Sequence, residues 1–360
     1  MWAGHQGRTV GRWAALGLLG GVLALLGACS SGGTPPAADS TTSAGRPVAA
    51  AAAPGSGPPA RTRIQYGMVS RNVHNWPIFV AEQQGFFEHE GLEVETTQTG
   101  ASVRAVQFVA SGSLDVVSAS ADAVILGHDR GAPVVIVGGV NRAVYSLVAQ
   151  PHIRAYSALR GATLGVSALK GGETTHLRKL LQARGLQESD YHLVVGGGTA
   201  ERYIAFRSGA FDAAMLPSPE DVQLRQDGYP ILGSSKEVLP HFPFLTMAAR
   251  QDWAAANADT LVRWLRAVGR AIDWIYDPSN REGALRGLTE GIGATREAAE
   301  QTYEGWIVQD HILYPRGAID LASIQAMLEL MLEQGDLSAP LPPPERFVDL
   351  RYQEAALRAP

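Results

Sequence analysis

The chain has 360 residues, of which 46% are hydrophobic, and a formal net charge of −5 at pH 7. This length allows one large domain or two of moderate size, with enough apolar side chains to form a core. The negative charge and the lack of a basic stripe in the sequence argue against a nucleic-acid-binding protein. The single cysteine, Cys29, excludes an intrachain disulfide and a cysteine-based zinc site.

Residues 1–28 have the pattern of an export signal. Arg8 and Arg12 give a positively charged start, and residues 13–26 form an apolar run too short to span a bilayer as a helix. The run ends in Leu-Gly-Ala directly before Cys29, which resembles a bacterial lipoprotein signal. The resemblance implies cleavage before Cys29 and a mature protein anchored to the membrane by lipid on that cysteine. An ordinary secretory signal with an incidental cysteine is the alternative.

Residues 29–60 consist mainly of Ala, Gly, Ser, Thr and Pro. A segment with so few large apolar side chains cannot bury enough surface to become ordered. We interpret it as a disordered tether, with the folded body beginning near Arg61.

From residue 61 onward, strand and helix patterns alternate, which is typical of α/β folds with a mostly parallel sheet. Residues 134–140 (VVIVGGV) are a run of β-branched residues and glycine, which we interpret as a buried central strand. Pro77 suits the first turn of a helix that ends at Gly85. Further strands are expected near 63–69, 92–97, 163–166, 191–195, 211–216, 230–232 and 244–249, and further helices near 102–110, 121–131, 174–184, 199–208, 252–274, 295–309 and 319–333.

One short motif occurs twice. Residues 111–115 (SGSLD) and 208–212 (SGAFD) each link a helical pattern to an apolar strand. The glycine suits a left-handed residue after the helix. In the second copy, Tyr203, Ile204 and Phe206 can share one helix face. The repetition suggests two similar α/β halves, although turns with Gly and Asp occur in many α/β folds.

Loops at the carboxyl ends of parallel strands are where such folds bind ligands. Here these loops are rich in Ser, Thr, Gly and Asn, and they precede helices whose N-termini carry a partial positive charge. The loops therefore suit an anion or a polar acceptor. They comprise residues 70–76, 99–102, 118–120, 168–174, 197–200 and 217–219.

The order of these motifs resembles the periplasmic substrate-binding proteins of ABC transporters, in the sulfonate, nitrate and thiamine-precursor (SsuA/THI5-like) group. Its most specific part is Ala81-x-x-x-Gly85-Phe86-Phe87 followed by Gly91-Leu92. The resemblance implies a two-lobed, type II periplasmic-binding-protein fold that closes on its ligand about a hinge. Each lobe would be a mostly parallel sheet flanked by helices, with an extra helical C-terminal part. The lobes would be residues 61–147 with 248–360, and residues 148–247, with crossings near 145–150 and 245–250.

The resemblance also implies a set of ligand-binding positions. They are Ser70, Asn75, Trp76, Gly100, Ala101, Ser102, Ser118, Ala119, Ser120, Lys170, Gly171, Gly172, Glu173, Thr174, Thr199, Pro217 and Ser218.

Several of these side chains also have an ordinary structural interpretation. Trp76 can stack on a planar ligand or pack against its own helix. Lys170 can neutralise a sulfonate or be a solvated loop lysine. Thr174 and Thr199 can be helix caps or ligand contacts. His74 has no second ligand at metal spacing nearby, so no metal site is expected. Arg71 and Arg202 are expected at the surface.

The sequence predicts a binding protein and not an enzyme, with no cofactor. Residues 165–169 lack the last glycine of a nucleophile elbow, and no Walker loop occurs. The expected function is a lipid-anchored solute-binding protein of the bacterial cell envelope, periplasmic or extracytoplasmic. Its partners would be a small-molecule solute, an ABC permease and an ATPase on separate chains, and the membrane through the lipid, with no nucleic acid. It would be a monomer. An exported enzyme and a ligand sensor are alternatives, and sulfonate, nitrate, aromatic acid and pyrimidine ligands stay open.

Overall fold

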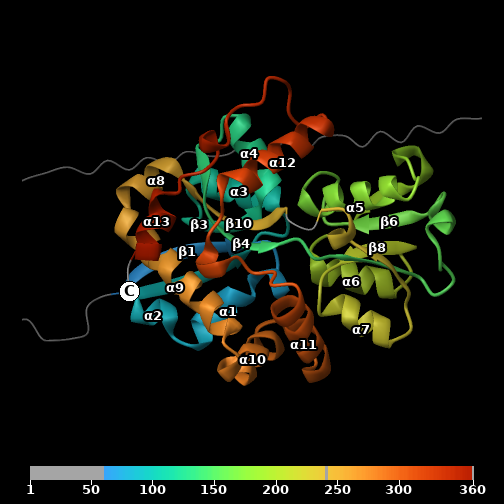
Figure 1. The fold of residues 1–360 in the computed structure, drawn as a ribbon, viewed down its shortest axis with the longest axis horizontal. Coiled ribbons are helices and arrows are strands. Elements are labelled where there is room, and N and C mark those ends of the chain that lie inside the picture. Colours follow the sequence, from blue (N-terminus) through green and yellow to red (C-terminus); the bar gives the residue numbers. More distant parts are fainter. Residues whose placement is uncertain (1–60, 240–241, 359–360) are drawn as a thin grey trace, which may run out of the picture. The chain divides into compact units, whose positions relative to one another are not determined.

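The computed structural model describes residues 61–239 and 242–358 (Figure 1). The predicted signal peptide, the lipidation site Cys29 and the predicted tether at 29–60 lie outside these residues.

Two five-stranded sheets form the centres of two lobes (Figure 1). The strand order is β2-β1-β3-β10-β4 in the first sheet and β7-β6-β8-β5-β9 in the second, so the two orders correspond position by position. The two-lobed fold expected from the sequence is thereby confirmed. The strands are β1 (Thr62–Met68), β2 (Leu92–Gln98), β3 (Val116–Ser120), β4 (Val134–Arg142), β5 (Ser146–Ala149), β6 (Thr163–Val166), β7 (His192–Val195), β8 (Ala213–Leu216), β9 (Ile231–Ser234) and β10 (Pro243–Arg250).

Each sheet is parallel except for one strand. In the first sheet, β10 runs antiparallel to both β3 and β4. In the second, β5 runs antiparallel to both β8 and β9. These two strands follow the crossings between lobes: the chain leaves the first sheet after Arg142 and returns to it at Pro243. The predicted crossings near 145–150 and 245–250 are too late, because those residues already belong to β5 and β10.

The apolar run at 134–140 was predicted to be a central strand, and this prediction is wrong. Strand β4 lies at the end of the strand order, next to β10. The C-terminal part of the chain covers its free edge: the Ile136 N–H donates to the Phe347 carbonyl at 2.9 Å, and the Tyr314 N–H donates to the Val140 carbonyl at 3.0 Å. Both faces and the edge of β4 are therefore buried, which accounts for its uninterrupted apolar sequence.

Helices cover both faces of the first sheet. Helices α3, α4 and α12 share a core with Val134 and Ile136, while α1, α2 and α9 share the core that contains Val135 and Val137. None of the helices in the described ranges is both long and apolar enough to cross a membrane. The helices are α1 (Trp76–Gln83), α2 (Phe86–His89), α3 (Ser102–Ser111), α4 (Ala121–Asp129), α5 (Gly172–Ala183), α6 (Thr199–Arg207), α7 (Glu220–Gln226), α8 (Gln251–Ala256), α9 (Ala258–Tyr276), α10 (Arg281–Ile292), α11 (Arg296–Tyr303), α12 (Leu321–Glu333) and α13 (Arg351–Arg358), with a π-helical turn at Glu304–Gln309.

Three helix predictions need correction. The helix expected at 252–274 is divided at Asn257 into α8 and α9, and α10 was not predicted. Ile204 does not share a buried face with Phe206: the residue is 68% exposed, whereas Phe206 is fully buried. At 100° per residue, positions 204 and 206 lie about 160° apart around the helix axis.

The repeated motif performs the same structural task in both lobes. The Asp115 carboxylate accepts the Gln65 N–H of β1 at 2.8 Å, and the Asp212 carboxylate accepts the Thr163 N–H of β6 at 2.7 Å. The backbone N–H of each aspartate donates in return to the carbonyl of the same residue at 2.8 Å. Each aspartate thus ties the turn before β3 or β8 to the neighbouring strand, at Gln65 in the middle of β1 and at Thr163, the first residue of β6.

The residue before each aspartate packs over a glycine of that strand. A Cβ on Gly67 would lie 2.5 Å from Leu114, and a Cβ on Gly165 would lie 2.5 Å from Phe211. These glycines are therefore required for close approach, two positions after Gln65 and Thr163 respectively. The predicted similarity of the two α/β halves is confirmed by this matched set of contacts.

Candidate ligand-binding site

A small cavity of about 40 Å³ lies between the two lobes and is lined from both. It lies where strands β1, β3, β6 and β7 end, as expected for the carboxyl ends of parallel strands. Nine of the residues predicted from the sequence line it: Ser70, Asn75, Ser102, Ser120, Lys170, Gly171, Gly172, Glu173 and Thr199.

A hydrogen bond crosses this cavity directly. The Asn72 side-chain amide in the first lobe donates to the Thr199 hydroxyl, the first residue of α6 in the second lobe, at 3.1 Å. The same amide donates to the Ser70 hydroxyl at 3.0 Å. Thr199 therefore helps to join the lobes, in addition to starting its helix.

The other eight predicted positions lie outside the cavity lining: Trp76, Gly100, Ala101, Ser118, Ala119, Thr174, Pro217 and Ser218. Trp76 is fully buried in the core, where its indole N–H donates to the Ala284 carbonyl at 2.9 Å and its ring packs edge-on against Tyr303. Ser118 bonds to the Tyr66 hydroxyl. The hydroxyls of Thr174 and Ser218 donate to the Ala168 carbonyl at 2.6 Å and the Asp221 carboxylate at 2.8 Å.

His74 is the most informative cavity residue that the sequence analysis did not select. Its imidazole lies among the rings of Tyr145, Phe244 and Trp306, with centroid distances of 4.9, 4.7 and 5.2 Å. Nδ1 lies 3.0 Å from Asn141 Oδ1, and Nε2 makes no hydrogen bond within the described part of the chain. Burial lowers the pKa of His74 to about 3, so the ring is neutral.

The wall contributed by the second lobe contains a buried ion pair. Arg202 Nη2 lies 2.9 Å from Glu173 Oε2, and both side chains are buried. Arg202 also donates to the carbonyls of Met215 at 3.0 Å and Gly197 at 2.8 Å. Burial raises the pKa of the Glu173 carboxyl, and the Arg202 charge opposes this rise. The prediction that Arg202 lies at the surface is wrong, because three acceptors inside the lobe satisfy its guanidinium.

Residues 72–281, more than half of the chain, match the family described as "NMT1/THI5 like". The chain belongs to the NMT1/THI5-like family.

Individual relatives agree with this assignment. The formylaminopyrimidine-binding protein of Halalkalibacterium halodurans is 24% identical over 222 residues, which cover 60% of this chain and 66% of that protein. The alkanesulfonate-binding protein SsuA from Xanthomonas axonopodis pv. citri, bound to MOPS, has a TM-score of 0.66 at 18% identity, over 80% of this chain and 98% of its own. The periplasmic nitrate-binding protein NrtA from Synechocystis has a TM-score of 0.70 at 17% identity, over 82% and 89%. The two structures share the fold of this chain.

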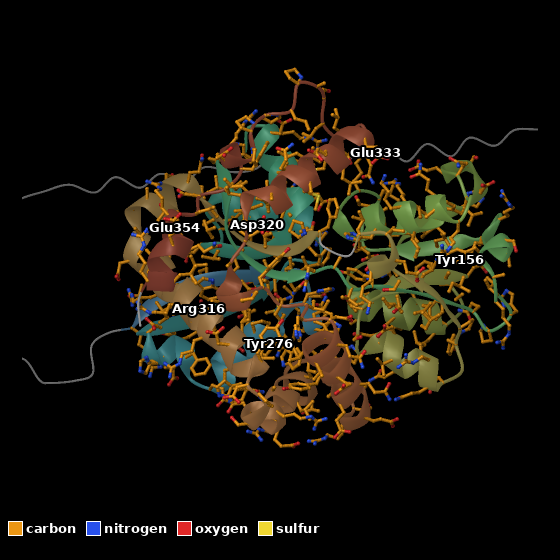
Figure 2. The ribbon with its side chains drawn as sticks, in the orientation of Figure 1. Tyr156, Tyr276, Arg316, Asp320, Glu333 and Glu354 are labelled. Atoms are coloured by element: carbon orange, nitrogen blue, oxygen red, sulfur yellow. The ribbon has the colours of Figure 1, made fainter. Side chains whose placement is uncertain are left out.

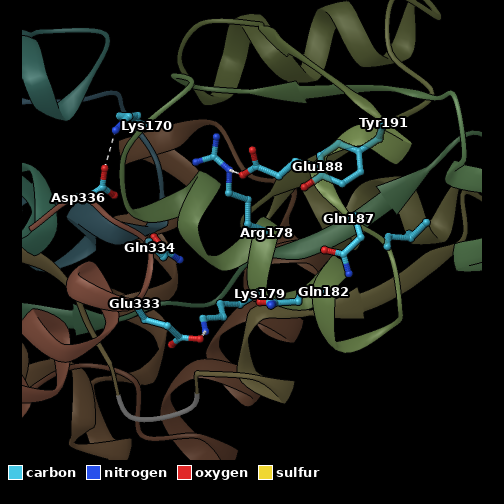
Figure 3. A pocket seen from close by; sticks show the side chains of 11 residues that line it. Lys170, Arg178, Lys179, Gln182, Gln187, Glu188, Tyr191, Glu333, Gln334 and Asp336 are labelled. Atoms are coloured by element: carbon cyan, nitrogen blue, oxygen red, sulfur yellow. Dashed lines mark hydrogen bonds and ion pairs between the residues drawn. The ribbon is translucent and has the colours of Figure 1, made fainter.

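In this member of the NMT1/THI5-like family, the end of α12 contacts α5 across the lobes (Figures 2 and 3). Lys170 Nζ lies 2.6 Å from Asp336 Oδ1, and Lys179 Nζ lies 2.5 Å from Glu333 Oε1. The Thr175 hydroxyl donates to the Gln334 side chain at 3.3 Å. A second cavity of about 340 Å³ lies beside these contacts. Lys170, predicted either to neutralise a ligand or to be a solvated loop lysine, has a side chain that is 61% exposed and forms this ion pair at the surface, in agreement with the solvated interpretation.

Helix α11 and the π-helical turn after it make similar contacts with the second lobe. Lys236 Nζ lies 2.5 Å from Asp310 Oδ2, and Arg225 Nη2 donates to the Gln301 side chain at 2.8 Å. In each of these ion pairs between the lobes, the cation belongs to the second lobe and the anion to the C-terminal part of the chain. The closed lobes are therefore electrostatically complementary.

Acid is expected to destabilise the protein through two buried histidines. Burial lowers the pKa of His74 to about 3 and that of His176 to about 4, from an ordinary value of 6.5. The folded state therefore binds fewer protons than the unfolded state below pH 6.5. The stability that neutral histidine contributes is complete above pH 6.5 and is lost as the pH falls toward 4, by up to about 1.4 kcal/mol per pH unit and per histidine.

Urea denaturation between pH 7.5 and 5 measures this effect. The His176→Leu variant should have a smaller decline in unfolding free energy than the unaltered protein, and a variant of the exposed His192, His192→Gln, should decline as the unaltered protein does. Equal declines in all three proteins would contradict the prediction.

Proposed function

We propose that this chain is the solute-binding component of an ABC importer, which captures a small polar organic solute between its two lobes. The observation that carries the proposal is the cavity lined from both lobes, with a hydrogen bond across it, in a chain that passes twice between the two sheets. Hinge closure around such a site is driven by the higher affinity of the closed state for the solute. The relatives named above support this function, because their names describe proteins that bind formylaminopyrimidine, alkanesulfonate and nitrate.

The location and partners belong to the same proposal. The export pattern before Cys29 supports an extracytoplasmic lipoprotein of the bacterial envelope, anchored through that cysteine. The solute would pass to a permease, with an ATPase as a further subunit on a separate chain. We propose a monomer whose lobes are divided between Arg142 and Ser146 and between Ser234 and Pro243, earlier in the chain than the boundaries expected from the sequence.

Native mass spectrometry of the protein, purified from its cells without refolding, tests the function. We expect a small molecule in a one-to-one ratio that is released on unfolding. The Thr199→Val variant, which loses the hydroxyl that accepts from Asn72, should retain less of it. Ser208→Ala is the matched control, because the Ser208 hydroxyl is exposed and donates to the Ala205 carbonyl of its own helix.

The same preparation separates binding from the enzyme and sensor alternatives. A binding protein releases the solute chemically unchanged after long incubation. Time-dependent conversion of the solute would overturn the proposal in favour of an exported enzyme. Transport of the solute by cells that lack this gene, together with loss of a transcriptional response to it, would favour a sensor.

A further inference from the structure

The fully buried side chain of Asn141 determines which of the two ring nitrogens of the neutral His74 imidazole carries the proton. The Asn141 Nδ2 group donates to the His74 carbonyl at 2.8 Å, which turns Oδ1 toward the imidazole, 3.0 Å from Nδ1. An amide oxygen can only accept, so Nδ1 carries the proton. In a neutral imidazole the other nitrogen, Nε2, is then a hydrogen-bond acceptor.

The ring that carries this acceptor belongs to the lining of the cavity. His74 lines the cavity and is 1% exposed, and its Nε2 has no partner in the described residues. A buried acceptor without a donor costs free energy, so the site favours a solute that supplies an N–H or an O–H. The rings of Tyr145 and Phe244 also line the cavity and pack against the imidazole and against each other, with their own centroids 5.1 Å apart, and this aromatic lining favours a flat solute.

The basic side chains at the cavity already have acidic partners, one pair buried and the other exposed. Of the described lining residues, the two bases are Arg202, paired with Glu173, and Lys170, paired with Asp336. The first turns of α4, α5 and α6 carry the carboxylates of Asp122, Glu173 and Glu201, whereas that of α3 has none. A carboxylate in the first turn interacts favourably with the helix dipole. The sequence-based expectation of an anion site at these N-termini is therefore not supported by their charges.

Building on the proposed function, we propose that the cleft selects uncharged, planar solutes that donate a hydrogen bond to His74. Asn141 is the positioning residue for this selection, since it holds His74 as an acceptor. Oxyanions that cannot donate, such as nitrate and sulfonates, are poor ligands of this cleft.

A matched pair of probes tests the selection on the full-length protein by calorimetry, after bound solute has been removed. The probes are 4-amino-2-methylpyrimidine, whose amino group can donate a hydrogen bond, and 4-methoxy-2-methylpyrimidine, whose methoxy group cannot. Methanesulfonate and nitrate represent the oxyanions. We expect the amino probe to bind about tenfold more tightly than the methoxy probe, as one hydrogen bond requires. Equal binding of the two ring probes, or tighter binding of either anion, would overturn the proposal.

Two variants test the assigned roles. His74→Phe retains an aromatic ring among its neighbours but removes the acceptor, so the preference for the amino probe should disappear. Asn141→Leu should leave both tautomers of His74 populated, which ¹⁵N NMR of the labelled imidazole reports directly, and should reduce the same preference. Asn280→Ala, at the start of α10, is the control. A His74 ring protonated at Nε2 in the unaltered protein would overturn the role of Asn141.

Failure of this inference differs from failure of the proposed function. If the protein retains an oxyanion or a solute without a donor from a cell extract, the selection is wrong and the binding function stands. If it retains no solute and binds none of the four probes, both proposals are wrong.

Discussion

Arg202→Ala is expected to lower the free energy of unfolding by about 3–5 kcal/mol, because it leaves a buried carboxylate without its partner. Arg202 and Glu173 are 1% and 5% exposed and lie 2.9 Å apart, so little solvent can replace the lost charge. The substitution also removes the donors to the carbonyls of Met215 and Gly197. Denaturation in guanidinium chloride, followed by circular dichroism, measures the loss.

The control lies on the same helix. Arg207 pairs with Asp227, but these side chains are 43% and 46% exposed, so Arg207→Ala should change stability by no more than about 1 kcal/mol. Replacing both Arg202 and Glu173 with Met should recover much of the loss, because no unpaired charge then remains. A loss in Arg202→Ala no larger than that in Arg207→Ala would show that the pair is not buried as described.

Trp76→Ala is expected to cost about 3–5 kcal/mol of unfolding free energy, as for other large aromatic side chains in cores. The ring is fully buried against Tyr303 and beside Gly287 of α10, where a Cβ would lie 2.9 Å from the indole nitrogen. Trp76→Phe should cost less, about 1–3 kcal/mol, since it leaves the Ala284 carbonyl without its donor. Thermal and chemical denaturation measure both variants.

Solute binding distinguishes this structural role from the ligand-stacking role predicted from the sequence. Trp76→Phe should bind the released solute with unchanged affinity when measured below its denaturation midpoint. Trp253→Phe, a partly exposed tryptophan of α8, controls for the general effect of removing an indole. A large loss of affinity in Trp76→Phe with little loss of stability would restore the stacking role.

The fold was largely predictable because its signals are local. Alternating strand and helix patterns predicted the α/β class, and the repeated Gly-x-x-Asp motif marked equivalent turns in two halves. The resemblance to periplasmic substrate-binding proteins implied the two lobes. The position of β4 was not predictable in this way. A strand in the middle of a sheet is buried by its two neighbouring strands, whereas one edge of β4 is covered by the residues around Val348. Both situations produce the same apolar sequence, so the sequence pattern cannot distinguish them.

The site was predictable as a set of loops but not as a set of side chains. His74 and Trp76 lie two residues apart, in the turn before α1 and at its first residue, yet one lines the cavity and the other enters the core. Their directions are decided by Asn141 and Ala284, which are distant in the sequence. Likewise, nothing near Arg202 in the sequence indicates that Glu173 lies beside it. Residue types and spacing alone do not contain these long-range contacts.

The positions of the two antiparallel strands, β5 and β10, affect the order in which the lobes can form as the chain is synthesised. All five strands of the second sheet come from one continuous segment, so that sheet is complete once residue 234 has emerged. The first sheet cannot join β3 to β4 until β10 arrives, since β10 lies between them. Domains fold as units from the N-terminus where they can. Here we expect the opposite order, with the lobe that begins later in the chain reaching its final structure first.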